Sequence, residues 1–199
     1  MVKNNSWNST YPVGIGSAGT NAGSFTQIHG IVTYNGTSLV NYAGPQISAS
    51  GYYTNSSHPA FVAYLSTNPT NVTGDGTNYK IVFNTALNNK SSSYGTGTGT
   101  FTAPVAGFYC FILGCTMSNI VNQTQAYLQI NTSAGNFTNN VLNSKKAQDS
   151  ASIQFGMQIG VSLGAGGTAE FYVVAQNSTL TVGLVGGFEN TYCMGYLVC

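Results

Sequence analysis

Short apolar stretches separated by turn residues follow one another from residue 59 to residue 199. Apolar residues nowhere recur for long at the spacing of an amphipathic helix, and Gly and β-branched residues interrupt every candidate. The pattern instead predicts an all-β sandwich or barrel of short strands. We expect strands at 59–66, 79–85, 97–103, 107–118, 124–132, 150–163, 168–177, 179–186 and 191–199.

The strand that starts at residue 107 has two apolar faces. Alternate residues of a strand face opposite sides, so one face carries Tyr109, Phe111 and Leu113 and the other carries Phe108, Cys110 and Ile112. An antiparallel strand with one face in water alternates apolar and polar residues instead. One face therefore belongs to the core, and the other must meet a second sheet or another subunit.

The first quarter of the chain differs from the rest. Residues 1–54 are rich in Gly, Ser and Thr and contain little to bury, apart from one or two short strand-like runs. Turn residues concentrate in SASGYYTNSSHP, which ends at Pro59. We therefore expect a short N-terminal β neck over 1–54 and a head domain over 55–199.

The run IVFNTALNN, followed by TGTFTAPVAGFYCF, resembles the globular-head domain of complement subcomponent q, within the tumour necrosis factor-like jelly rolls. PAFVAYLS at 59–66 and YCMGYLV near the C-terminus fit the two ends of that family, although Cys193 stands where the family usually has Phe. The matching motif residues are Tyr94, Thr98, Gly99, Phe101, Thr102, Ala103, Pro104, Gly107, Tyr109, Phe111, Gly195 and Tyr196.

The resemblance implies a ten-stranded jelly roll that assembles as a homotrimer about a three-fold axis. Both termini would then lie at the stalk end. The loops at the opposite tip, in chain order, would be 67–78, 118–123, 164–167 and 186–190.

The composition limits which classes of binding partner are expected. Charged residues make up 5% of the chain and the formal net charge is +1, whereas about 25% is usual. Nucleic acid is an improbable partner because phosphate binding needs a clustered basic surface. A surface of amides and hydroxyls is typical of extracellular fibres, capsid-like proteins and adhesins.

No stretch is long and apolar enough for membrane insertion, and the start MVKNNSWNST shows no signal peptide. The chain is therefore expected to be either a virion component released without a signal or a piece of a longer fibre.

Candidate chemistry is sparse. Four acidic residues and two His are spread along the chain, and no motif of a hydrolase, metalloprotease or P-loop occurs, so we expect no enzyme activity and no cofactor. Some relatives in the family hold calcium near the tip, and GDGTN around Asp75 is oxygen-rich. It lacks the EF-hand spacing, which favours a plain Asp-Gly turn over a calcium site.

The four cysteines allow two interpretations. The resemblance makes 107–118 and 191–199 antiparallel neighbours, which would bring Cys115 near Cys193 and Cys110 near Cys199 if a bulge at Gly114 absorbs a one-residue mismatch. Two disulfides are one outcome. Four buried free thiols that pack as small hydrophobic groups are the other.

The sequence therefore predicts a trimeric, non-catalytic binding head at the tip of a bacterial or viral fibre, an adhesin that contacts a host or prey surface glycan or protein. A purely structural trimerising cap, such as a capsid or fibre decoration, is the alternative, and an enzyme acting on polysaccharide is a third. The expected oligomer and core strand comprises Phe108, Tyr109, Cys110, Phe111 and Ile112. The candidate ligand residues, all in the expected tip loops, are Asp75, Asn119, Asn122, Phe188, Glu189 and Asn190. The alternative for Phe188 is a ring turned inward to close the jelly roll.

Overall fold

The structure, a computed structural model, describes residues 32–34, 39–41, 46–47, 53–54, 58–140 and 152–199. It divides the chain into two compact units, Met1–Ser57 and His58–Cys199. In the first, β1 (Val32–Tyr34) pairs with β2 (Leu39–Asn41), and β3 (Gln46–Ile47) pairs with β4 (Tyr53–Thr54). Most of the expected neck lies outside the described residues. We call the second unit the head.

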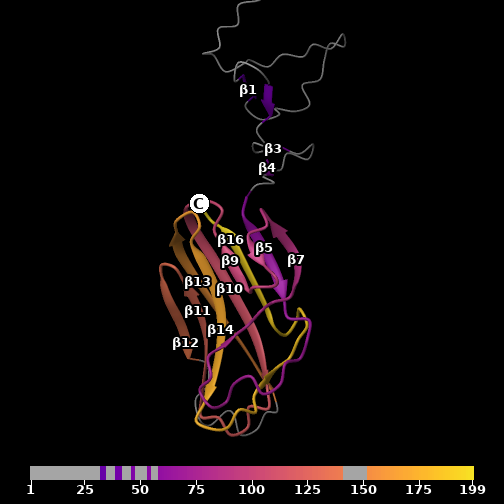
Figure 1. Cartoon of the computed structure of the whole chain (residues 1–199), viewed down its shortest axis with the longest axis vertical. Helices are drawn as coiled ribbons and strands as arrows, with labels where there is room; N and C mark the ends of the chain where they lie inside the picture. The colour runs from indigo at the N-terminus through magenta and orange to yellow at the C-terminus, as the bar shows by residue number, and fades with distance from the viewer. Residues whose placement is uncertain (1–31, 35–38, 42–45, 48–52, 55–57, 141–151) are drawn as a thin grey trace, which may run out of the picture. The chain divides into compact units, whose positions relative to one another are not determined.

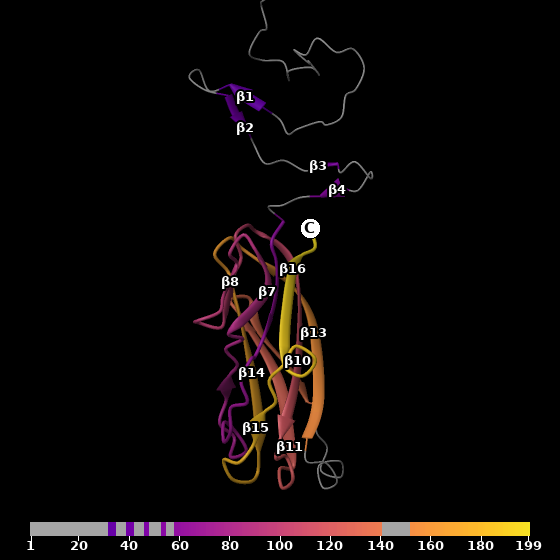
Figure 2. The same ribbon diagram turned by 90° about the vertical axis from the view of Figure 1, so that its right-hand side faces the viewer.

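The head consists of two antiparallel sheets, drawn in Figures 1 and 2. The first has the order β13-β10-β16-β5-β7, and the second has the order β12-β11-β14-β9-β8, which makes two paths of five strands each. The two-residue strands β6 and β15 pair with β14 and β10. The strands are β5 (Ala60–Tyr64), β6 (Tyr79–Lys80), β7 (Thr85–Lys90), β8 (Tyr94–Gly95), β9 (Thr100–Thr102), β10 (Gly107–Ser118), β11 (Gln125–Thr132), β12 (Gly135–Asn140), β13 (Ser152–Leu163), β14 (Thr168–Gln176), β15 (Gly183–Leu184) and β16 (Tyr192–Leu197). No helix occurs in this part of the chain, and the predicted all-β jelly roll is confirmed.

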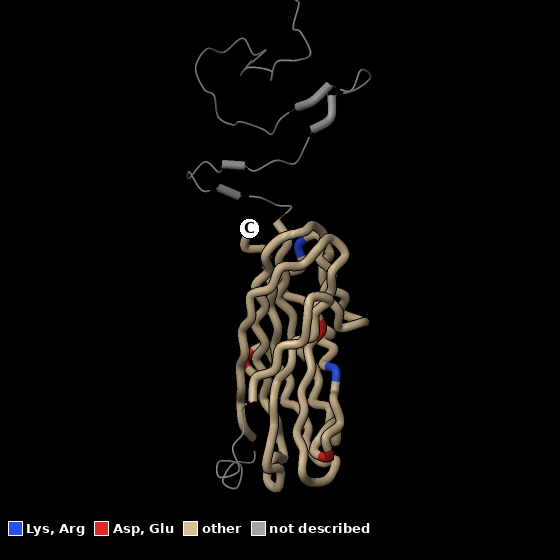
Figure 3. The backbone as a smooth tube through the Cα atoms, turned by 90° about the vertical axis from the view of Figure 1, so that its left-hand side faces the viewer, with Lys and Arg blue, Asp and Glu red and all other residues tan. Residues whose placement is uncertain are grey.

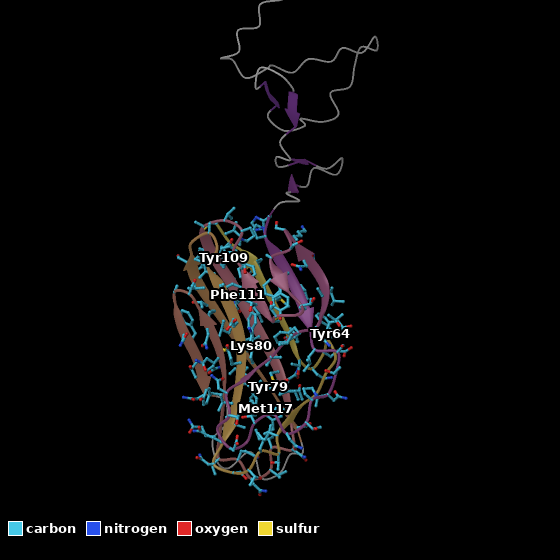
Figure 4. The ribbon with its side chains drawn as sticks, in the orientation of Figure 1. Tyr64, Tyr79, Lys80, Tyr109, Phe111 and Met117 are labelled. Atoms are coloured by element: carbon cyan, nitrogen blue, oxygen red, sulfur yellow. The ribbon has the colours of Figure 1, made fainter. Side chains whose placement is uncertain are left out.

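Aromatic rings from both sheets fill the space between them. Tyr109 and Phe111 of β10 are fully buried, as is Met117 farther along the same strand (Figure 4). Phe111 packs edge-on against Phe101 of the second sheet, with ring centroids 5.1 Å apart. Phe61 stacks on Tyr94 at 4.8 Å. These rings bury a large apolar area, which is the main favourable contribution to folding.

The corner before β10 explains why a Thr/Gly run leads directly into this apolar strand. The hydroxyl of Tyr109 donates a hydrogen bond to the carbonyl of Val105 at 2.8 Å, which closes the corner. A Cβ at Gly107 would lie 2.7 Å from the carbonyl oxygen of Cys199. Residue 107 must therefore lack a side chain, because the C-terminal residues pass directly over it.

Several expected strands differ in extent. The expected strand 79–85 is interrupted, because only Tyr79–Lys80 pairs with β14 before the chain crosses to β7 of the other sheet. The expected strand 97–103 shrinks to β9, since Gly99 has a φ of +67° that ends the ladder. The expected strand 179–186 shrinks to β15. Strands β7 and β12 were missed, because TALNNK and GNFTNN carry few apolar residues and lie at sheet edges.

The two ends of the head are set by β10 and its neighbours. Gly107 lies opposite Leu163, and the His58 imidazole forms a hydrogen bond with the Leu197 carbonyl. Residue 58 and the C-terminus therefore lie at one end of the head, which we call the C-terminal end. Gly166 donates a backbone hydrogen bond to Ala103 at this same end. The expectation that 164–167 belongs to the tip is therefore wrong, because β13 runs antiparallel to β10 and returns the chain to the C-terminal end.

The register of β10 and β16 bears on the two interpretations of the cysteines. Cys193 lies opposite Leu113 and Cys110 opposite Tyr196, and the pairing continues through Gly114 without a bulge. Cys199 lies beside Gly107, away from Cys110. All four cysteines are free, so neither Cys115–Cys193 nor Cys110–Cys199 is bonded. Burial raises the pKa of Cys115 to about 12 and holds the pKa of Cys193 well above its ordinary value, and both thiols pack as small hydrophobic groups in the core.

Candidate functional site

The outward side of the three central strands of the first sheet, β10, β16 and β5, is largely apolar. Cross-strand pairs place Ile112 beside Met194 and Met194 beside Val62, and place Cys110 beside Tyr196. Phe108, Tyr196 and Val198 are 39%, 41% and 50% exposed. We call this surface the apolar face. It comprises Ala60, Val62, Phe108, Cys110, Ile112, Met194, Tyr196 and Val198. The expected second apolar side of strand 107–118 is thus outward, while Tyr109 and Phe111 belong to the core.

The loop 186–190 lies beside this apolar face. The ring of Phe188 packs against Tyr64 at 6.3 Å and against Tyr192 at 5.7 Å, and both tyrosines occupy outward positions of the sheet. Glu189 accepts a hydrogen bond from Gln154 of β13 through its carbonyl at 2.7 Å. The Asn190 carbonyl accepts one from the Thr116 hydroxyl at 3.1 Å. Phe188 is 42% exposed, so it does not close the core, and its ring contacts place it against Tyr64 and Tyr192 of the first sheet.

The remaining expected ligand residues lie at the end opposite the C-terminus, which we call the distal end. Thr73 forms a bridge with Val182, which ties the loop 67–78 to the segment after β14. The Gln123 side-chain amide donates a hydrogen bond to the Thr181 hydroxyl at 3.3 Å, which ties the loop 118–123 to the same segment. The structure therefore brings Asp75, Asn119 and Asn122 to one end of the head, together with a segment, 177–182, that sequence reasoning did not include.

Asp75 caps its own turn. Its carboxylate accepts the backbone N–H of Thr77 at 3.0 Å, and this hydrogen bonding lowers the pKa of the Asp75 carboxyl. Gly74 and Gly76 on either side have φ values of +130° and +97°. The plain Asp-Gly turn accounts for this arrangement. Among the described residues, no three His, Cys, Asp or Glu side chains gather in a way that could hold a metal ion.

The outward side of the second sheet is polar, and sequence reasoning missed it. Glu170 of β14 accepts hydrogen bonds from Lys80 at 2.7 Å, from the Thr100 hydroxyl at 2.9 Å and from the Tyr172 hydroxyl at 2.7 Å. The hydrogen bond from Lys80 is the largest cause of the lowered Glu170 pKa. The hydrogen bond that Tyr172 donates to Glu170 raises the pKa of Tyr172 to about 12. The strict alternation in QAYLQINT, with Gln125, Tyr127, Gln129 and Asn131 on one side, was the available signal.

Charges are few across the head, as Figure 3 shows. The described residues contain two lysines, Lys80 and Lys90, and three acids, Asp75, Glu170 and Glu189. The acids lie on a distal loop, on the polar side of the second sheet and beside the apolar face, so no two of them share one element. No segment described by the structure forms a helix that could cross a membrane.

Comparison with known proteins identifies the family. A model of the C1q domain matches residues 60–162, just over half of the 199-residue chain. The structure is similar to the globular domain of zebrafish complement 1qA protein, with 18% identity, a TM-score of 0.52, and coverage of 71% of this chain and 98% of that chain. It is also similar to murine APRIL at pH 8.0, with 8% identity, a TM-score of 0.50, and coverage of 71% and 99%. No curated protein matches the sequence. The chain belongs to the C1q domain family.

Proposed function

We propose that the head is a non-catalytic binding module that works as a homotrimer. The apolar face is the observation that supports this proposal. An outward sheet surface on a solvated monomer is ordinarily polar, and contiguous exposed apolar patches mark interaction sites. A second and a third copy of the chain are the occupants that the family resemblance favours.

The distal end is the surface that we propose for contact with a partner. Three copies of 67–78, 118–123 and 177–182 would present the same loops in one assembly, and repeated weak contacts raise the overall affinity by avidity. Asn119 and Asn122 offer amides that donate and accept hydrogen bonds, and Val121 and Leu180 are each 44% exposed. The partner we propose is a glycan or protein on a host or prey surface.

The same features support a location outside the cell or on a virion, at the tip of a longer fibre. The surface is poor in charge and rich in amides and hydroxyls. A catalytic role for the acids finds no support in their positions, because a pair of carboxylates about 5–10 Å apart is needed for glycoside hydrolysis, and the three described acids lie on separate elements.

Two measurements test the proposal. Light scattering of the full chain at micromolar concentration should give the mass of three copies, and a stable monomer would contradict the trimer. Binding of the intact protein to glycan and cell arrays should fall when Asn122→Ala and Asn119→Gly are combined, with Glu189→Ala as the comparison beside the apolar face. Glycine is used at 119 because Asn119 has a φ of +59°. A trimer that binds nothing would instead be a structural cap.

A further inference from the structure

We propose that the polar side of the second sheet is a binding site for a neutral saccharide. We call this surface the polar face. It comprises Thr100, Tyr127, Gln129, Asn131, Glu170, Tyr172, Asn136, Thr138 and Lys80. This site goes beyond the proposed function, because it lies on a different surface from the distal loops and is contained within one protomer.

Cross-strand pairing arranges these residues in two rows. One row runs Asn136–Asn131–Glu170–Thr100 across β12, β11, β14 and β9, and the next runs Thr138–Gln129–Tyr172–Lys80 with β6 at its end. Each row contains amide and hydroxyl side chains and one charged group. Sugar hydroxyls donate and accept at once, and amides and hydroxyls are the side chains that match both roles.

The charges of the polar face cancel. Lys80 and Glu170 form an ion pair at 2.7 Å, with side chains 28% and 30% exposed. A free basic surplus that would attract phosphates or acidic sugars is therefore missing from these rows, and the carboxylate of Glu170 opposes an anion. The three donors also hold the Glu170 carboxylate in one orientation, two of them on Oε1 and one on Oε2, so the remaining lone pair of Oε2 is a fixed acceptor before a ligand arrives.

Asn131 adds an acceptor without a donor. Its Oδ1 is buried and has no hydrogen-bond partner, and it is the one such side-chain atom among the described residues. A buried polar atom left unpaired costs about 1–3 kcal/mol. Asn131 lies directly opposite Glu170, and its amide must rotate outward before Oδ1 can accept a hydrogen bond from the hydroxyl of a ligand above this pair.

Two tyrosine rings supply the apolar part of the site. Tyr127 lies opposite Val174, and Tyr172 lies opposite Gln129, which places the two tyrosines diagonally across neighbouring strands. Diagonal neighbours on one sheet face are about 7–8 Å apart at Cα, within reach of aromatic side chains. Both rings are partly exposed. Tyrosine combines a flat apolar surface with a hydroxyl, which suits the C–H-rich face of a pyranose ring.

The test uses the full 199-residue chain and an array of neutral oligosaccharides of glucose, galactose, mannose and N-acetylglucosamine, with sialylated and sulfated glycans as the acidic set. The best neutral probe is then titrated by calorimetry against Gln129→Ala, Glu170→Gln and the control Asn88→Ala, which is exposed on β7 of the other sheet. Gln129→Ala should weaken binding about tenfold, the equivalent of one lost hydrogen bond, and Glu170→Gln should weaken it more. Asn88→Ala should leave it unchanged.

The outcomes separate this site from the proposed function. A monomeric variant of the apolar face should bind the neutral saccharide with the same affinity per protomer, even if the trimer and its distal contacts are lost. If Glu170→Gln fails to fold, Gln129→Ala on the partly exposed surface still decides. No bound neutral glycan, preference for the acidic set, or loss of binding with Asn122→Ala but not with Gln129→Ala would each overturn the polar-face site.

Discussion

Phe108 lies with its ring across Gly160 on the neighbouring strand, so that a Cβ at position 160 would be 2.5 Å from Phe108 Cζ. Phe108 is 39% exposed. A glycine on one strand thus provides the space in which an aromatic ring of the next strand lies flat on the apolar face. The same arrangement recurs where Tyr192 covers Gly114.

Replacement of Gly160 by Ala should weaken the trimer. The added methyl group displaces the Phe108 ring outward, and the displaced ring disturbs the surface that we propose to pack against other copies. Gly156→Ala is the matched control, because it lies on the same side of β13 and its Cβ would meet nothing closer than 3.6 Å. Sedimentation at a series of concentrations should show earlier dissociation for Gly160→Ala, and equal dissociation of the two variants would argue against Phe108 as a contact.

A charge on the apolar face should produce a folded monomer. Ile112→Lys places an ammonium group at the centre of the apolar face, where its desolvation in a trimer is costly. Leu180→Lys is the control, since Leu180 is a similarly apolar side chain, 44% exposed, at the distal end. Light scattering should give the mass of a single chain for Ile112→Lys and the mass of three chains for the control. A trimeric Ile112→Lys would move the interface elsewhere.

Substitutions at Phe111 should damage folding itself. Phe111→Ala should lower the free energy of unfolding by about 3–5 kcal/mol, the usual result when a fully buried Phe is truncated, and Phe111→Asp should abolish folding because it buries a charge. Phe188→Ala, at a ring that is 42% exposed, should cost far less. Denaturant unfolding at one fixed protein concentration measures this, since association contributes to apparent stability. Similar losses for Phe111→Ala and Phe188→Ala would contradict the assignment of Phe111 to the core.

Acid should remove the contribution of Glu170. In the folded protein the pKa of Glu170 is lowered, chiefly by the hydrogen bond from Lys80. The ionised carboxylate therefore contributes to folding stability above the ordinary glutamate pKa of 4.5. This contribution is lost as the pH falls through the lower pKa of the folded state. A partly exposed pair of this kind contributes about 0.2–1 kcal/mol. Glu170→Gln should therefore reduce the melting temperature slightly at pH 7 and not at pH 2. An equal reduction at both pH values would show that the charge of Glu170 has no part in stability.

The thiols should be reduced and mostly unreactive. Cys115 and Cys193 are fully buried with raised pKa values, and the thiolate is the reactive form. A thiol reagent added to the native protein should label the exposed Cys199 quickly and the other three only after denaturation. Intact mass with and without reductant should be the same, and a loss of two or four hydrogens would restore the disulfide interpretation.

The sequence by itself determined which way the side chains of each long strand face. Alternation is a local property, because successive residues of a strand point to opposite sides. It therefore placed Tyr109 and Phe111 on one side of 107–118 and Phe108 and Ile112 on the other, and the motif around Phe101 and Pro104 indicated the jelly roll.

Only the tertiary structure decided how the strands meet. The register of β10 against β16 separates the cysteines, the antiparallel course of β13 returns 164–167 to the C-terminal end, and the path of 186–190 brings Phe188 to Tyr64 and Tyr192. Likewise Glu170, Lys80 and Asn131 are distant in sequence and become neighbours through the pairing of β14 with β6 and β11. These relationships depend on the packing of many side chains between the two sheets, since sliding a strand by one residue reverses every side chain it carries.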